Sequence, residues 1–279
     1  MKAQFSLTVA EGKKLIAKGI AALPEVRRAL ADGMILLKGG TTVSALAEEL
    51  AGTPLRISGR ISLRGTVAAA RTVEGAHSLL LRGGRPEAAD GRLEAIAAEM
   101  GPDDVVVCGA NIVDSCGNAA MMAGRFMGGE PGRILPLLPS QGVRCIIAAG
   151  VEKISPTSVP EAMKACGRKA PAWSMGMAVG LVPLFGRIVS EPEALRALGA
   201  RDAWVIGRGG VSGAEGGATF VVDGDERWFE TFRTVLENVR GAETSGVAGS
   251  IDECLRCGPN GADHLACCYR DELRKENDR

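Results

Sequence analysis

The sequence predicts an α/β protein: a doubly wound, mostly parallel sheet, followed by a smaller α+β (βαββα) module and a cysteine-rich tail. Two observations carry this prediction. Short apolar runs alternate with helical patterns from residue 9 to 170, at the spacing typical of strand–helix–strand units. Glycine is abundant, at 38 of 279 residues, while aromatic residues make up only 4%. We therefore expect an aliphatic core and many turns that need a bare backbone.

The first domain, expected over residues 1–175, takes its strands from apolar runs and its helices from residues spaced three or four apart. The expected strands are Met34–Leu37, Ser78–Leu81, Asp104–Cys108 and Cys145–Ala149. The expected helices are Val9–Leu23, Glu25–Ala31, Val43–Leu50, Pro86–Met100 and Ile134–Leu138.

A second module is expected over residues 176–240, and residues 241–279 are expected to form a solvated tail. The module's elements are a strand Leu181–Ser190, a helix Glu191–Leu198, strands Ala203–Ile206 and Ala218–Val222, and a helix Asp225–Val239. The glycine-rich segment Gly207–Gly217 lies between two strand-like runs, which favours a hairpin loop.

Charge and composition exclude several classes of partner. The 33 basic residues balance 33 acidic ones, so a polyanion-binding surface for nucleic acid is not expected. The sequence contains neither a signal peptide nor an apolar run of transmembrane length, so we expect a cytoplasmic protein without a membrane partner. Cys108, Cys116, Cys145 and Cys166 stand in apolar segments, which is typical of buried, reduced thiols. The sequence leaves open whether the chain forms a homo-oligomer.

The first candidate site is the segment Lys38-Gly39-Gly40-Thr41-Thr42 between a predicted strand and a predicted helix. Glycines let amide groups turn inward, the helix start adds partial positive charge, and the threonine hydroxyls are further donors. This pattern favours a phosphate or carboxylate site. A tight turn with a threonine N-cap is the equal alternative.

Further glycine-rich segments follow the strand that ends at Cys108. Gly109 and Asn111 come directly after it, where α/β sheets bind ligands. Asp114 opens a turn, and a second loop contains Gly128, Gly129, Glu130 and Gly132 before a helix.

Residues 10–155, through these segments, resemble one superfamily: ribose-5-phosphate isomerase, glucosamine-6-phosphate deaminase, the coenzyme A transferases, methylthioribose-1-phosphate isomerase and the lactate-utilisation domain. The resemblance implies a phosphate-binding loop at residues 38–42. It also implies a catalytic aspartate where this chain has Asn111, and an amide cannot take a proton from a sugar carbon. Asp114 then corresponds to a further acidic residue of the isomerases. Glutamate is the nucleophile of the transferases, and Glu130 and Glu215 stand in glycine-rich loops.

The candidate catalytic residues are accordingly Asp114 and Glu130, although a turn-forming role for Asp114 is the more favoured alternative. Two functions remain open. The first is a cytoplasmic enzyme, an isomerase or transferase, that binds a phosphorylated or coenzyme A-linked small molecule. The second is a non-catalytic ligand-binding or assembly protein on the same fold, which the asparagine at position 111 favours.

The tail contains Cys254 and Cys257, then His264, Cys267 and Cys268. The spacings Cys-x2-Cys and His-x2-Cys supply four ligands within fifteen residues, as a tetrahedral Zn²⁺ site needs. An iron–sulfur cluster is the competing interpretation. A reduced tail without metal is the third. Elsewhere, Arg56, Arg60 and Arg64 recur every four residues in an extended segment, where they form either an anion-binding face or a solvated one.

Overall fold

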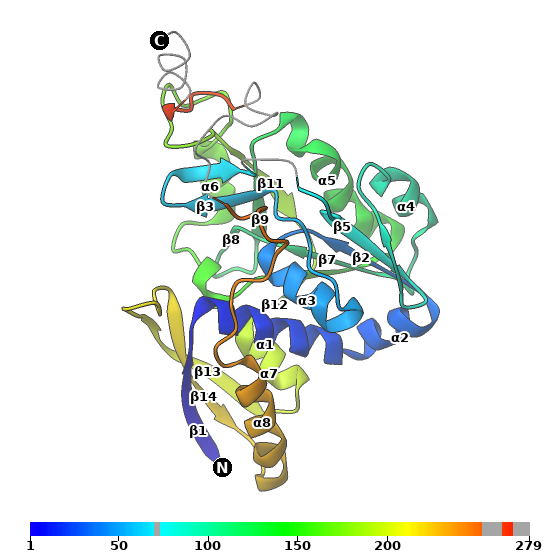
Figure 1. Ribbon diagram of the computed structural model, residues 1–279, viewed down its shortest axis with the longest axis vertical. Coiled ribbons are helices and arrows are strands. Elements are labelled where there is room, and N and C mark those ends of the chain that lie inside the picture. Colours follow the sequence, from blue (N-terminus) through cyan, green and yellow to red (C-terminus); the bar gives the residue numbers. More distant parts are fainter. Residues whose placement is uncertain (70–72, 253–263, 270–279) are drawn as a thin grey trace.

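The computed structural model describes residues 1–69, 73–252 and 264–269, and these form mixed α/β structure (Figure 1). A six-stranded sheet with the order β12-β10-β7-β2-β5-β6 forms the centre. Smaller antiparallel sheets have the orders β1-β14-β13, β11-β9-β8 and β3-β4. In the described ranges, no helix is both long and apolar enough to cross a membrane.

The elements of the first half are β1 (Lys2–Leu7), α1 (Val9–Ala22), α2 (Pro24–Asp32), β2 (Met34–Lys38), α3 (Thr41–Ala51), β3 (Gly59–Ser62), β4 (Gly65–Ala68), β5 (Ser78–Arg82), β6 (Arg85–Ala88), α4 (Leu93–Glu99), β7 (Val105–Gly109), β8 (Ile112–Val113) and β9 (Ala119–Ala123). Those of the second half are η1 (Phe126–Gly128), α5 (Gly129–Ile134), η2 (Leu135–Gln141), β10 (Arg144–Ala148), η3 (Val151–Lys153), α6 (Val159–Ala165), β11 (Gly180–Leu184), β12 (Arg187–Val189), α7 (Glu191–Ala197), β13 (Asp202–Gly209), β14 (Gly217–Asp223) and α8 (Glu226–Val239). The label η marks 3₁₀ helices.

Four neighbouring strands of the large sheet, β12, β10, β7 and β2, run parallel. Leu37 of β2 lies opposite Val107 of β7, which lies opposite Ile146 of β10. The carboxyl ends of these strands therefore reach the same edge of the sheet at the same level. The prediction of an α/β fold with a mostly parallel sheet is confirmed in this coarse form.

The other two strands, β5 and β6, are antiparallel, and here one prediction is wrong. The segment Pro86–Met100 was expected to be a single helix, but its first part is strand β6 and only α4 is helical. Gly83 and Gly84 both have positive φ, at 53° and 74°, and they connect paired residues of β5 and β6 as a two-residue hairpin turn. Pro86 is tolerated because β6 is the edge strand of the sheet.

Both faces of the large sheet are buried. Ile35 and Leu37 face a core shared with α1, α2, α3 and α7, whereas Leu36 faces a second core shared with α4 and η2. In Figure 1, α1 and α3 lie on one side of the sheet and α4 and α5 on the other. Strands buried on both sides explain the unbroken apolar runs that made them recognisable in the sequence.

The smaller module lies at the end of the molecule that contains the amino terminus (Figure 1). Its predicted hairpin is confirmed, since β13 and β14 pair antiparallel across the glycine-rich turn. The predicted strand Leu181–Ser190 is instead two strands: β11 pairs with β9, and β12 extends the large sheet. The third strand of the module is β1, which was not predicted and pairs with β14.

Aromatic packing explains why β1 joins this module. The ring of Phe5 lies 5.6 Å from that of Phe220 and 5.2 Å from that of Phe232 on α8, measured between centroids. Phe220 and Phe232 are both buried. A short strand with alternating exposure thus contributes one large side chain to a core formed by residues more than 200 positions away.

The expected solvated tail also differs in its first part. Ser250 is buried, its hydroxyl accepts a hydrogen bond from the amide of Ile57 at 3.0 Å, and the amide of Val247 donates to the carbonyl of Leu55 at 2.9 Å. Polar side chains and backbone, rather than apolar periodicity, attach this segment to the first domain. Among the four cysteines expected to be buried, Cys108 is, but Cys116 is exposed in the β8–β9 turn.

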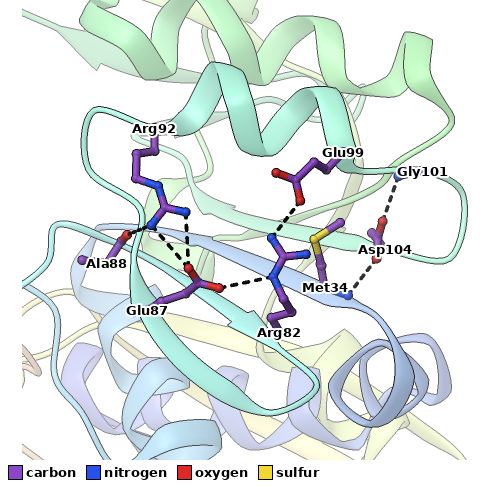
Figure 2. A network of polar contacts seen from close by, with 8 residues as sticks. All are labelled: Met34, Arg82, Glu87, Ala88, Arg92, Glu99, Gly101 and Asp104. Atoms are coloured by element: carbon purple, nitrogen blue, oxygen red, sulfur yellow. Dashed lines mark hydrogen bonds and ion pairs between the residues drawn. The ribbon is translucent and has the colours of Figure 1, made fainter.

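A network of polar contacts lies at the amino-terminal edge of the large sheet, in two groups around Asp104 and around Arg82 (Figure 2). The buried carboxylate of Asp104 accepts hydrogen bonds from the amides of Met34 at 2.7 Å and Gly101 at 2.8 Å. On the surface beside it, Arg82 contacts Glu99 at 2.9 Å. The first interaction satisfies a buried amide, whereas the second is an exposed ion pair.

We predict that Asp104→Ala lowers the free energy of unfolding by about 1–3 kcal/mol, because it leaves the buried Met34 amide without an acceptor. The matched control Glu99→Ala removes an exposed carboxylate of the same network and should change the free energy by less than about 0.5 kcal/mol. Urea unfolding followed by circular dichroism measures both. Equal losses for the two variants would show that the buried hydrogen bond is not the stabilising element.

Candidate anion-binding cavity

A cavity of about 790 Å³ opens at the carboxyl-terminal edge of the large sheet. Lys38 at the end of β2, Gly109 at the end of β7 and Ala148 at the end of β10 all line it. The hairpin β3–β4 and the residues just before and after it also line the cavity. Residues 244, 251 and 264 complete its wall. The cavity therefore lies where open α/β sheets bind their ligands.

The predicted segment after β2 forms one wall, and Gly39, Gly40, Thr41 and Thr42 all line the cavity. Gly39 is required because a Cβ there would collide with the carbonyl oxygen and the ring of His77. Gly40 is the N-cap of α3 and has no side chain that could accept from the first amides of the helix. Those amides have no acceptor within the helix, and the helix dipole adds positive potential.

The antiparallel strands β5 and β6 bring two further side chains to this wall. Ser78, the first residue of β5, lies opposite Lys38, so His77 stands beside the end of β2. Asp90, two residues after β6, accepts hydrogen bonds from the amides of His77 at 2.8 Å and Ser78 at 2.9 Å. It also forms an ion pair with Arg56 at 3.2 Å.

His77 is neutral in this environment. Burial, and then the nearby Lys38 ammonium, lower the pKa of His77 to about 4. Its Nδ1 lies 2.8 Å from the carbonyl oxygen of Arg56, which can only accept, so Nδ1 carries the proton. The lone pair consequently resides on Nε2.

Lys38 has no ion-pair partner among the described residues. Burial is the main cause that lowers its pKa. Burial raises the pKa of the Cys108 thiol to about 12, so the thiol is neutral and provides no counter-charge. Lys38 is thus a cation at a strand end that no carboxylate within residues 1–69, 73–252 and 264–269 pairs with.

The arginine-rich segment divides between two surroundings. Arg56 and Arg60 line the cavity, and Arg60 donates to the carbonyl oxygens of Ser250 and Asp252. Arg64 instead lies over the ring of Tyr269, 3.8 Å from its centroid. Two of the three evenly spaced arginines thus lie in one wall of the cavity, whereas the third, in the turn of the hairpin β3–β4, contacts the tail.

The segment after β7, the strand next to β2, forms another part of the cavity wall. Gly109 and Asn111 line the cavity, and the side-chain oxygen of Asn111 accepts from the amide of Met122 at 2.9 Å. Asn111 therefore joins the end of β7 to strand β9. In this role its amide holds the wall in place, and Met121 and Met122 give that wall an apolar surface.

The second glycine loop contributes Gly128, Gly129 and Glu130 to the cavity. Gly128 adopts a left-handed conformation with φ of 72°, which suits glycine at the turn into α5. The Glu130 carboxylate accepts from the amide of Leu93 at 2.7 Å, so it caps the start of α4 from the cavity side. Gly132 does not line the cavity and packs against the carbonyl of Met127.

Asp114 lies away from the cavity and forms a turn. Its carboxylate accepts four hydrogen bonds of 2.9 Å, from the amides of Cys116, Asn118 and Val159 and from the side chain of Asn118. The bond from Val159 and the Asn118 side chain contribute most to lowering the pKa of Asp114 to about 2. This geometry matches the turn-forming alternative, and a catalytic role for Asp114 stays an untested prediction.

A group of charged side chains from α1, η3 and α7 lies at and beside another part of the cavity wall. Lys13 and Lys153 line the cavity, and Lys153 contacts Glu152 at 3.7 Å. Glu191 is buried and accepts from the amide of Val151 at 2.9 Å. Burial, together with the charge of Glu152, raises the pKa of Glu191 to about 7.

The tail residues fall partly outside the described ranges. Cys254 and Cys257 lie outside the described residues. His264 lines the cavity, and the backbone of Cys267 forms an isolated parallel β-bridge with that of Ser174. Among the described residues, no group of three or more histidine, cysteine, aspartate or glutamate side chains is placed to hold a metal ion. The zinc site stays a prediction.

Charge is the dominant property of the cavity. Among its described lining residues are the six cations Lys13, Lys38, Arg56, Arg60, Arg125 and Lys153. The carboxylates in the same wall are Asp90 and Glu130, and both already accept hydrogen bonds from backbone amides. This excess of positive charge, in a chain of zero net charge, favours an anionic ligand.

No protein-family model, no curated protein and no solved structure matches this chain. Its function therefore has to be inferred from the residues of the cavity. Three residues of the cavity wall were not predicted from the sequence: Lys13, His77 and Lys153. Lys38 and His77 each stand directly beside a glycine loop or a strand start, which is a usable signal, whereas Lys13 and Lys153 reach the site only through tertiary packing.

We predict that Glu191 makes stability fall as pH rises. The folded protein holds the Glu191 proton up to about pH 7, while an unfolded chain loses it near its ordinary value of 4.5. The free energy of unfolding should therefore decrease between these values, and the decrease is complete above pH 7. Glu191→Gln keeps an acceptor for the Val151 amide, and at pH 8 it should be more stable than the wild type by about 1–3 kcal/mol.

Denaturant unfolding at pH 5, 6, 7 and 8 measures this effect. The control Glu237→Gln removes an exposed carboxylate on α8 and should retain the wild-type pH dependence. An unchanged slope in Glu191→Gln would contradict the assignment.

Proposed function

We propose that the cavity binds the anionic part of a phosphorylated or coenzyme A-linked small molecule, and that the chain is a cytoplasmic enzyme of the isomerase or transferase class. The observation that carries the proposal is that six cations line the same cavity as the uncapped start of α3. A ligand phosphate would accept from the amides of Thr41 and Thr42 and meet lysine and arginine side chains. We also propose that the large sheet has the doubly wound arrangement that the sequence predicts.

The volume of the cavity supports a ligand larger than a free phosphate ion. At about 790 Å³ it lies within the range of roughly 300–1,000 Å³ that is typical of small-molecule sites. Its lining also includes apolar side chains, among them those of Met121 and Met122. Apolar lining beside the cations suits a molecule with an anionic end and a less polar body.

A second candidate function, binding without catalysis, is favoured by one observation. The amide of Asn111 is engaged in holding β9, and both carboxylates of the cavity wall accept backbone hydrogen bonds. Both carboxylates therefore already serve as hydrogen-bond acceptors for the backbone, and the amide of Asn111 cannot act as a general base. In this alternative the cysteines of the tail would bind zinc, or an iron–sulfur cluster, and serve as a docking element.

Binding is tested with inorganic phosphate, ribose 5-phosphate and coenzyme A, by isothermal titration of the full chain at fixed ionic strength. We predict that Lys13→Met weakens binding by about tenfold, because a charged hydrogen bond contributes roughly 1.5–3 kcal/mol. Lys14→Met is the matched control: Lys14 is the next residue of the same helix but pairs with Glu48 at 3.8 Å and does not line the cavity.

Lys14→Met should change the dissociation constant by less than about twofold, as expected for a surface ion pair. Equal effects of the two substitutions, or no binding of any of the three compounds, would contradict the proposal. Turnover assays on whichever compound binds separate the two candidate functions, since the second requires binding without any product.

A further inference from the structure

We propose that Lys38 is a catalytic amine that condenses with the carbonyl group of an aldehyde or ketone held in the cavity. The bond formed is an imine between Nζ of Lys38 and the carbonyl carbon of the ligand. The inference rests on the proposed function for the anionic part of that ligand, and it narrows the substrate class to phosphorylated carbonyl compounds.

The position of Lys38 carries the inference. It ends the central strand β2, it lines the cavity, and it directly precedes the glycine loop that opens α3. A phosphate bound at that loop would be adjacent to Lys38 along the chain. Its register partners, Ser78 and Cys108, are both buried, so strands on each side hold the backbone of Lys38 in place.

Lys38 also differs from other lysines in what surrounds it. Lys14, Lys18 and Lys153 each contact a glutamate within 4 Å. No carboxylate of the described residues pairs with Lys38, and the thiol of Cys108 is neutral. Burial without a counter-charge lowers the pKa of the amine, so a larger fraction is unprotonated and nucleophilic near neutral pH.

His77 supplies the proton transfers that the condensation needs. Its Nδ1 proton is committed to the carbonyl of Arg56, so Nε2 can accept a proton and later return it. The unprotonated amine attacks the carbonyl carbon, and the C=O electron pair moves to oxygen. His77 carries one proton from the new ammonium nitrogen to this oxygen, which gives a neutral carbinolamine. His77 then carries the second proton of that nitrogen to the hydroxyl group, which leaves as water while the C=N bond forms. Atoms balance as amine plus carbonyl giving imine plus water, and no oxidant or reductant is required.

The test uses pyridoxal 5′-phosphate, a phosphorylated aldehyde, with pyridoxal as the matched probe that lacks the phosphate. The full-length protein is incubated with each probe near neutral pH, reduced with sodium cyanoborohydride and mapped by peptide mass spectrometry. We expect Lys38 to be labelled at least about tenfold faster than Lys164, an exposed lysine on α6. We also expect pyridoxal 5′-phosphate to label Lys38 at concentrations at least tenfold lower than pyridoxal.

Inorganic phosphate should slow labelling of Lys38 but not of Lys164, and Lys38→Met should abolish the adduct. Lys38→Arg keeps the positive charge and is the second variant, so that a fold defect in Lys38→Met does not decide the result. Labelling at Lys13 or Lys153 in place of Lys38, or equal rates at Lys38 and Lys164, would overturn the inference.

The outcomes also separate this inference from the proposed function. Binding of ribose 5-phosphate without an adduct at Lys38 overturns the imine and leaves the anion site intact. An adduct that forms equally with both probes, and that phosphate does not slow, supports the reactive amine and contradicts the anion site. Failure of both measurements overturns both.

Discussion

The level register of β2, β7 and β10 determines where every element of the candidate site lies. Because Lys38 pairs with Cys108 and Gly109 pairs with Ala148, the loops that follow these strands start at the same height above the sheet. Strand β5 runs antiparallel to β2, and β6 returns antiparallel to β5. The start of β5 and the end of β6 therefore lie at the same edge of the sheet, where they position His77 and Asp90. A register shift of one residue in β2 would exchange Leu36 with Leu37 between the two cores and move Lys38 out of the cavity wall.

Concentrating six cations in one cavity costs free energy through their mutual repulsion, and the structure offsets this only locally. Asp90 neutralises Arg56, and Glu152 neutralises Lys153, at the rim of the cavity. At the end of β2 no carboxylate of the residues that the structure describes pairs with Lys38, and the uncapped amides of α3 add positive potential there. An arrangement of this kind is stabilised by an anionic ligand, because the ligand supplies the charge that the chain does not.

Most of the secondary structure could be predicted from the sequence, and the failures have identifiable causes. Helix α1 has its apolar residues on one face, so its bounds were expected almost to the residue, and in the structure a capping box formed by Thr8 and Glu11 begins it. Pro86 looked like a helix start, but the two glycines before it form a hairpin turn and make the proline part of an edge strand. Strand β1 contains one important contact, the packing of Phe5 on Phe220, that only the folded chain reveals.

The candidate site divides in the same way. The glycine loops were recognisable because their backbone requirements are local, and Gly39, Gly40, Gly109, Gly128 and Gly129 all line the cavity. Asp114 stood in the expected place along the chain, yet its carboxylate is directed to the amides of its own turn and of Val159. His77 directly precedes β5, so its place at a strand start could have indicated it, whereas Lys13 has no local signal for a site because the packing of α1 brings it there.

Chemical-shift mapping of the backbone amides during a titration with inorganic phosphate tests the central claim most directly. The deuterated, ¹⁵N-labelled full chain would be titrated at constant ionic strength, so that general screening does not contribute. The anion-binding account predicts that the largest shifts occur at Gly40, Thr41 and Thr42, with smaller shifts at Gly109. Shifts confined to exposed basic residues such as Arg27 and Arg28 on α2, with Gly40–Thr42 unchanged, would contradict it.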